Sequence, residues 1–159
     1  MTNYNDIFKS LAEVTNDTQV NEGGFKLIDE GNYEMEIVDV RFDPFKKGSS
    51  LAVDYETNDG QRGNETFTFD LKDKNGANTR ESILNSSANR MKALIVATQM
   101  AGILTMDDIT RGDEKVAEAL LPMVGLKFFS KVTHRTYEKK DGSGEGTSVN
   151  YTHEKNPID

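Results

Sequence analysis

The spacing of apolar residues along the chain predicts five strands with a helical region between the third and the fourth. Apolar and polar side chains alternate wherever a strand with one buried face is expected, over residues 33–42, 51–56, 65–71, 124–137 and 149–153. Between residues 80 and 100 the spacing becomes that of an amphipathic helix, and a shorter helix is predicted over 113–121. The protein is therefore expected to be mainly β with helices.

This order is that of the five-stranded oligonucleotide-binding barrel, the OB fold, in which a helix separates strands three and four. An ordinary mixed sheet with a helical layer is the alternative. The barrel is favoured because each strand has one apolar and one polar face, as a small closed sheet requires. We assign the OB-fold domain to residues 25–154, with a loose C-terminus over 155–159. Residues 1–24 are expected to form an amphipathic helix and a linker, and the helix either covers the protein's own core or docks on a partner.

At 159 residues the chain has room for one domain with a substantial core. It has no cysteine, no apolar run long enough to span a membrane and no secretory start, so we expect a cytoplasmic protein without a membrane partner. The net charge of −8 is unevenly distributed. Residues 1–40 carry nine acids against two lysines, whereas residues 124–140 carry five cations against one acid. This contrast singles out the fourth predicted strand as a candidate binding segment.

The fourth predicted strand combines cations with aromatic rings on one face. Alternate residues of a strand point the same way and stand about 7 Å apart, a spacing close to that of phosphates along an extended single strand. Cations can neutralise phosphates and rings can stack on bases, and this face carries both, at Lys127, Phe129, Lys131, Arg135 and Tyr137. Lysines on an exposed strand also protect a sheet edge from aggregation. That alternative explains the cations but not the two rings.

Two loops predicted to flank the same face supply further candidates. The loop after the first strand gathers two rings and three cations within seven residues, at Arg41, Phe42, Phe45, Lys46 and Lys47. In an OB fold this loop and the loop between strands four and five border the binding surface. The second of these loops is rich in glycine and begins with Lys139 and Lys140, so it either closes over a bound strand or is only a flexible hairpin tip.

No enzymatic or metal site is predicted. His134 and His153 are the only histidines, neither has a nucleophile or carboxylate at a motif-like spacing, and both are expected on the surface. The glycines of residues 142–146 precede a strand rather than a helix, so they do not form a phosphate-binding loop. We therefore expect a non-enzymatic protein with no cofactor and no metal.

Four short motifs, in residues 31–37, 45–48, 51–55 and 97–102, resemble those of a family of small phage proteins from replication and recombination gene clusters. Members of this family look like single-stranded DNA-binding proteins. The resemblance implies an OB fold and a role in protecting single strands during phage DNA replication or recombination, in the cytoplasm of the host. Many such proteins end in an acidic tail with a terminal aromatic residue that recruits partners, and this chain has no such tail.

Together these observations predict a single-stranded DNA-binding protein that acts by phosphate neutralisation and base stacking. Its expected partners are single-stranded DNA, a second copy of the chain in a homodimer, and phage replication or recombination proteins. The alternative is a protein-interaction module for dimerisation or binding of a host factor. A further alternative, an acidic mimic of DNA, rests on the acidic first 40 residues.

Overall fold

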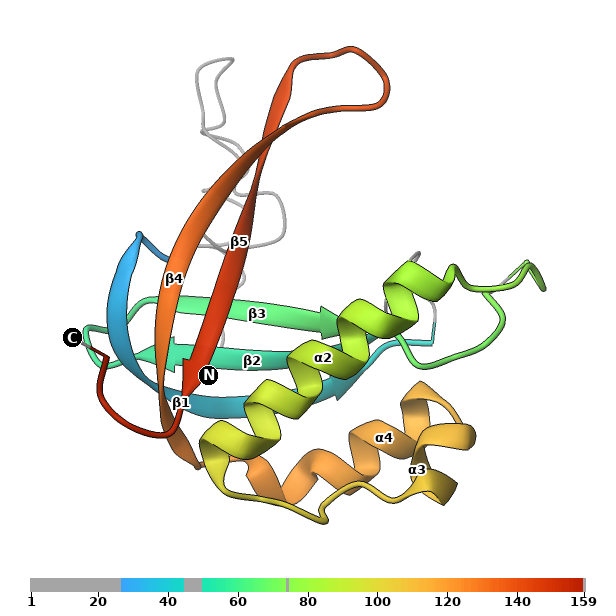
Figure 1. Ribbon diagram of the computed structural model, residues 1–159, viewed down its shortest axis with the longest axis horizontal. Coiled ribbons are helices and arrows are strands. Elements are labelled where there is room, and N and C mark those ends of the chain that lie inside the picture. The colour runs from blue at the N-terminus through green and yellow to red at the C-terminus, as the bar shows by residue number, and fades with distance from the viewer. Residues whose placement is uncertain (1–26, 45–49, 74, 159) are drawn as a thin grey trace, which may run out of the picture.

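The computed structural model describes residues 27–44, 50–73 and 75–158, so the helix predicted within residues 1–24 lies outside the described residues. Five antiparallel strands form one sheet in the order β3-β2-β1-β4-β5 (Figure 1). The strands are β1 (Gly31–Phe42), β2 (Leu51–Thr57), β3 (Arg62–Phe67), β4 (Lys127–Glu138) and β5 (Glu145–Glu154). Between β3 and β4 the chain forms α2 (Glu81–Thr98), α3 (Met106–Thr110), α4 (Asp113–Leu120) and the 3-10 turn η1 (Leu121–Met123). The predicted order of three strands, helices and two strands is confirmed, and α3 is an element that the sequence pattern did not predict.

The core lies between the inner face of the sheet and the helices, where α2 packs against β3 and β5. On α2 the buried residues follow the spacing of one helical face, at Ser87, Met91, Leu94 and Ala97. On the strands the side chains that face the helices are buried, and the largest of these are Met35, Ile37, Tyr55, Phe67 and Phe128. The side chains of the opposite face of the sheet, which we call the outer face, point away from this core.

Strand β3 ends earlier than its hydrophobic pattern predicts. The alternation continues to residue 71, but the strand stops at Phe67. The next two backbone amides donate to side chains of the helices, Thr68 to Ser87 Oγ at 2.8 Å and Phe69 to Asp113 Oδ1 at 2.6 Å. Because these amides are satisfied by α2 and α4 rather than by a neighbouring strand, the chain leaves the sheet while Phe69 is still buried.

The predicted closure of the sheet into a barrel is not confirmed. In the part of the chain that the structure describes, β3 and β5 are the two edges of the sheet and no backbone ladder joins them. Their side chains nevertheless meet, since His153 of β5 lies 2.8 Å from the carboxylate of Glu65 on β3. Tyr151 also covers Gly63 so closely that an added Cβ would lie 2.7 Å from its hydroxyl. The sheet is therefore open in its backbone pairing but curved enough for side chains to bridge its two edges.

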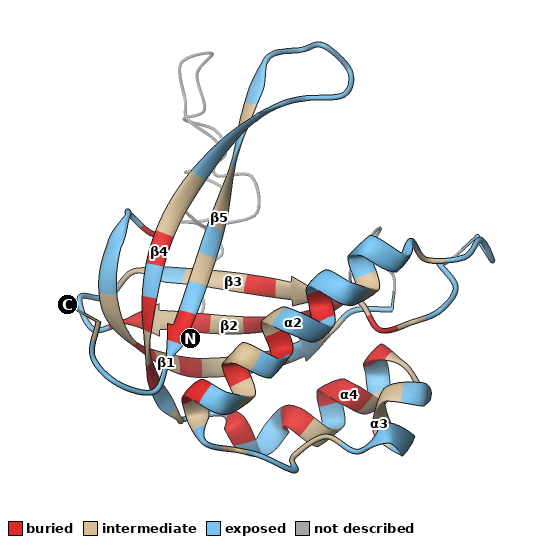
Figure 2. Ribbon diagram, in the orientation of Figure 1, coloured by how far each residue is buried: buried red, intermediate tan, exposed pale blue. Residues whose placement is uncertain are grey.

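Strands β4 and β5 extend beyond the rest of the sheet as a two-stranded hairpin (Figure 1). Strand β1 pairs with β4 only from Lys127 to Val132, whereas β5 pairs with β4 as far as Glu138. Residues 133–150, which we call the arm, therefore have no third strand beside them. Figure 2 shows that buried residues occur only in the lower half of this hairpin and that the arm is exposed or half-buried.

Candidate nucleic-acid interface

The alternation of β4 separates a buried face from an exposed face, as its sequence predicts. Phe128, Ser130 and Val132 point into the core and are at most 1% exposed. The intervening residues form the outer face of β4 and are exposed or half-buried, at Lys127, Phe129, Lys131, Thr133, Arg135 and Tyr137. Since successive residues of a strand point to opposite faces, these six side chains lie in one row.

On its outer face the β4–β5 hairpin carries cations and no acid from Lys131 to Tyr137. Residues paired directly across two strands point to the same side, so the partners of this row on β5 are Gly146, Ser148, Asn150, Thr152 and Glu154. The single acid among them, Glu154, stands beside Phe129 at the foot of the hairpin. Glu138 and Glu145 pair with each other on the opposite face. From Lys131 outwards, the row therefore presents two cations among neutral polar groups.

The two predicted stacking rings have different surroundings. Tyr137, near the end of β4, is 48% exposed, and its ring lies against the backbone of Gly146, its partner on β5. That glycine leaves room for the ring, so one face of Tyr137 is supported and the other is open. Phe129 is half-buried between Glu34 and Glu154. Eight residues separate the rings, roughly 27 Å along a strand, so they are placed to contact two different bases.

The two predicted lysines are exposed at the turn of the hairpin. The strands extend to Glu138 and Glu145, so the turn is shorter than the predicted loop. It is closed by backbone bonds from Lys139 N to Gly144 O and from Gly142 N to Lys139 O, each 3.0 Å. The residues Lys139 and Lys140 are exposed. They carry positive charge to the tip of the hairpin, where Asp141 is also exposed and accepts hydrogen bonds from Ser143.

The end of β1 and the loop after it contribute fewer available side chains to the candidate interface than their composition suggests. Arg41 donates two hydrogen bonds of 2.7 Å to Asp54, and this contact is the main reason that the pKa of Arg41 is raised. Phe42 is partly buried against the core. Arg41 and Phe42 are thus engaged within the protein, while the predicted contacts of Phe45, Lys46 and Lys47 lie outside the described residues.

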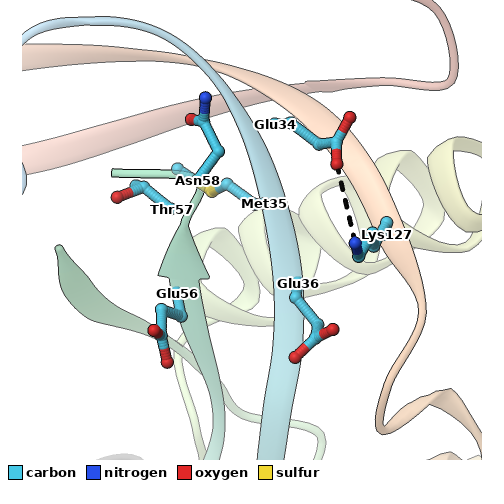
Figure 3. A pocket seen from close by; sticks show the side chains of 7 residues that line it. All are labelled: Glu34, Met35, Glu36, Glu56, Thr57, Asn58 and Lys127. Carbon is cyan, nitrogen blue, oxygen red and sulfur yellow. Dashed lines mark ion pairs between the residues drawn. The ribbon is translucent and has the colours of Figure 1, made fainter. Parts of the chain in front are cut away.

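The foot of the outer face is acidic. A pocket of about 300 Å³ opens beside Lys127 and is lined by Glu34, Met35, Glu36, Glu56, Thr57, Asn58 and Lys127. Figure 3 shows the three glutamates arriving from β1 and β2 and an ion pair of 3.9 Å between Glu34 and Lys127. Lys127, which the sequence analysis places with the other phosphate contacts, is therefore partly neutralised. The sequence pattern did not reveal this, because the glutamates precede it by more than 70 residues.

A buried polar cluster links the two edges of the sheet, and the sequence analysis missed it. Glu65 accepts a hydrogen bond of 2.7 Å from Tyr55, lies 2.8 Å from His153 Nε2 and forms an ion pair of 3.3 Å with Arg90 of α2. The prediction that His153 lies on the surface is wrong, since the residue is 7% exposed. Burial is the first cause of the raised pKa of Tyr55, and the charge of Glu65 is the second. The available signal was that Glu65 is in phase with the buried Phe67.

Ser130 lies directly across from His153 on the inner face, so a hydroxyl, an imidazole and the Glu65 carboxylate follow one another in the core. They are not hydrogen-bonded in series, because Ser130 Oγ and His153 Nδ1 have no hydrogen-bond partner among the described residues. Such a series can activate a nucleophile when substrate can reach it. Here Ser130 is 0% exposed, and the side chains of His153 and Glu65 are 1% and 5% exposed. The cluster therefore serves to hold β5 against β3 rather than to meet a substrate.

Neither a metal-binding cluster nor a membrane-spanning helix is found in the described part of the chain. It contains no group of three or more histidine, aspartate or glutamate residues arranged to hold a metal ion. None of its helices is long and apolar enough to cross a membrane.

Most of the chain is similar to a known protein family. The model of a family described as "Protein of unknown function (DUF669)" matches residues 14–140, most of the chain. That range includes β1 to β4 and the first turn residues of the hairpin. No curated protein matches the chain.

Proposed function

The chain belongs to the DUF669 family, and we propose that it binds single-stranded DNA along the outer face of the β4–β5 hairpin. The observation that carries this proposal is the row on β4 in which cations and rings alternate with no acid beyond Phe129. Lys131 and Arg135 neutralise phosphates, Lys139 and Lys140 extend the contact at the turn, and Phe129 and Tyr137 stack on bases. Contacts of this kind tolerate any sequence, because every base has a flat π face.

The fold supports the same proposal. An OB fold has three strands, a helix and two strands, and it binds oligonucleotides over the face of strands two and three and with the loops after strands one and four. The second of these loops is the hairpin turn that carries Lys139 and Lys140. The chain has this order, and side chains bridge its two edge strands at Glu65 and His153. We therefore propose that the sheet is an OB fold whose closure is made by side chains.

The length of the exposed row sets the size of the site. From Phe129 to Tyr137 the row measures roughly 27 Å, room for about four nucleotides of extended strand, the lower end of the range for one OB fold. We extend the proposal to a role in phage DNA replication or recombination in the host cytoplasm, with replication or recombination proteins as further partners. That extension rests on the short motifs quoted above.

The proposal is tested by removing the rings. Phe129→Ala with Tyr137→Ala is expected to weaken binding to a labelled oligo-dT by about 2–6 kcal/mol, since stacking contributes roughly 1–3 kcal/mol per base. Fluorescence anisotropy at low salt measures the affinity, and circular dichroism melting shows whether the variant stays folded. A matched control is Tyr33→Ala, which removes a half-buried ring of β1. If the double variant bound oligo-dT as tightly as the parent, the stacking face would be wrongly assigned.

A second candidate function is self-association through the hairpin. Beyond Val132, β4 pairs only with β5, and β5 pairs only with β4, so within the described residues neither edge of the arm has a strand beside it. One amide of the β4 edge is engaged, since His134 N donates to Glu30 Oε2 at 3.0 Å. Free strand edges are surfaces on which another chain can add a strand. This would give the homodimer that the sequence analysis expects. Sedimentation of the protein with and without oligonucleotide separates the two functions: a dimer that ignores DNA at low salt favours the interaction module.

A further inference from the structure

We propose that the three glutamates at the foot of the hairpin, Glu34, Glu36 and Glu56, make the outer face selective for single-stranded over double-stranded DNA. This inference rests on the function proposed above and concerns the specificity of the same site. In this role the glutamates do not have to bind a ligand. They act by repelling a phosphate backbone that passes over them.

The register of the strands places all three on the outer face, in line with the row of β4. Glu36 pairs with Lys127 on one side and with Glu56 on the other, and Glu34 pairs with Phe129. Neighbouring strands lie about 4.8 Å apart, so the backbone of Glu56 is roughly 10 Å from that of Lys127. All three carboxylates therefore lie directly beside the lower end of the proposed path of the strand (Figure 3).

The cations near these carboxylates offset them only in part. Glu34 pairs with Lys127 at 3.9 Å, and Glu56 pairs with Arg62 at 3.1 Å, but Lys127 and Arg62 are each more than half exposed. No ion-pair partner of Glu36 lies within the described residues. Glu154 adds a fourth carboxylate on the other side of Phe129. The outer face therefore changes sign along its length, negative at the foot and positive from Lys131 to Arg135.

A flexible strand and a stiff duplex respond differently to this change of sign. Single-stranded DNA can follow Lys131, Arg135 and the turn lysines and then bend away before it reaches the glutamates. Duplex DNA has a persistence length of about 150 base pairs, so over this short face it behaves as a straight rod. A duplex aligned with the arm must continue over the acidic foot, and one that crosses the arm meets few of its cations. Repulsion of the wrong ligand is a common source of specificity.

The inference is tested by neutralising the three glutamates of the foot. In Glu34→Gln/Glu36→Gln/Glu56→Gln three negative charges are removed with little change of shape. A control variant, Glu81→Gln/Glu114→Gln/Glu118→Gln, removes the same charge from exposed positions on α2 and α4 and likewise releases a paired lysine, Lys115. Both variants and the parent are titrated with labelled oligo-dT and with a labelled duplex of equal length at low salt. Thermal melting confirms that each protein is folded.

We expect the foot variant to bind the duplex roughly fivefold to tenfold more tightly than the parent, and to bind oligo-dT less than about twofold more tightly. The duplex passes within the screening length of about 10 Å of the removed charges, whereas oligo-dT can bend away from them. The control should change both affinities equally and slightly. The inference fails if the foot variant leaves duplex affinity unchanged or if the control raises it as much. If the parent itself does not bind oligo-dT, the proposed function fails and the selectivity fails with it.

Discussion

Removal of the positive charges of Lys131 and Arg135 should lower the salt dependence of DNA binding by a calculable amount. Lys131 and Arg135 lie on the outer face four residues apart, about 13 Å along the strand, which is the span of two phosphate intervals. Each phosphate neutralised on a single strand contributes about 0.7 to the slope of log affinity against log salt. With Lys139 and Lys140 the row has four exposed cations, so the parent slope should be about 2.8 and that of Lys131→Gln/Arg135→Gln about 1.4.

Fluorescence anisotropy of a labelled oligo-dT over a series of salt concentrations measures both slopes. Lys72→Gln/Lys92→Gln is the matched control, because both lysines are exposed, lie outside the sheet and carry the same charge. Its slope should equal that of the parent. Surface substitutions of this kind usually change stability by no more than about 0.5 kcal/mol, so unfolding should not intervene. An unchanged slope in Lys131→Gln/Arg135→Gln, or an equal fall in the control, would refute the assignment of these two cations to phosphate contacts.

Three further predictions concern the stability of the fold. Glu65→Ala should lower the free energy of unfolding by about 3–5 kcal/mol, because it leaves His153 and its neighbours buried without their acceptor; a loss below about 1 kcal/mol in urea denaturation would contradict this. Gly63→Ala should cost about 1–3 kcal/mol, since the new Cβ would lie 2.7 Å from the Tyr151 hydroxyl, and an unchanged urea midpoint would argue against the close approach. Burial raises the pKa of Asp113 from 3.8 to about 6, so the folded state keeps a proton that the unfolded state has already lost. Stability should fall as the pH rises from about 4 through 6, by at most about 3 kcal/mol, and Asp113→Asn should flatten this part of the stability profile.

The strands and their faces could be predicted because each depends on local alternation alone. The outer row of β4 is the clearest case: once Phe128 and Val132 are assigned to the core, the positions of Phe129, Lys131 and Arg135 follow from the two-residue repeat. The end of β3 could not be predicted in this way. It is decided by Ser87 and Asp113, which accept the backbone amides after Phe67 from 19 and 44 residues away.

The ion-pair and hydrogen-bond partners of the charged residues could not be predicted from the sequence either. A run of cations predicts phosphate contacts only if the cations are not already paired with acids of the protein. Whether they are paired depends on residues of other strands. Arg41 meets Asp54 because β1 and β2 pair in a particular register, and Lys127 meets Glu34 because β1 also pairs with β4. His153 is buried because Glu65, 88 residues earlier, supplies its hydrogen-bond partner. Local composition thus placed the cations and rings along one strand but did not show which of them are paired within the protein.

The net charge of −8 does not decide whether this protein can bind a polyanion, because charge acts over a limited distance. At physiological ionic strength the screening length is about 8 Å, whereas the hairpin from Lys131 to the turn is roughly 24 Å long. A phosphate beside Arg135 therefore interacts mainly with the outer face of the arm and little with the glutamates near Lys127. An acid close to it is Glu30, whose carboxylate accepts a hydrogen bond from the backbone amide of His134 at the edge of β4. The glutamates near Lys127 still repel ligands that are too stiff or too wide to stay on the arm. The same separation of charge that permits binding can thus restrict it to a flexible single strand.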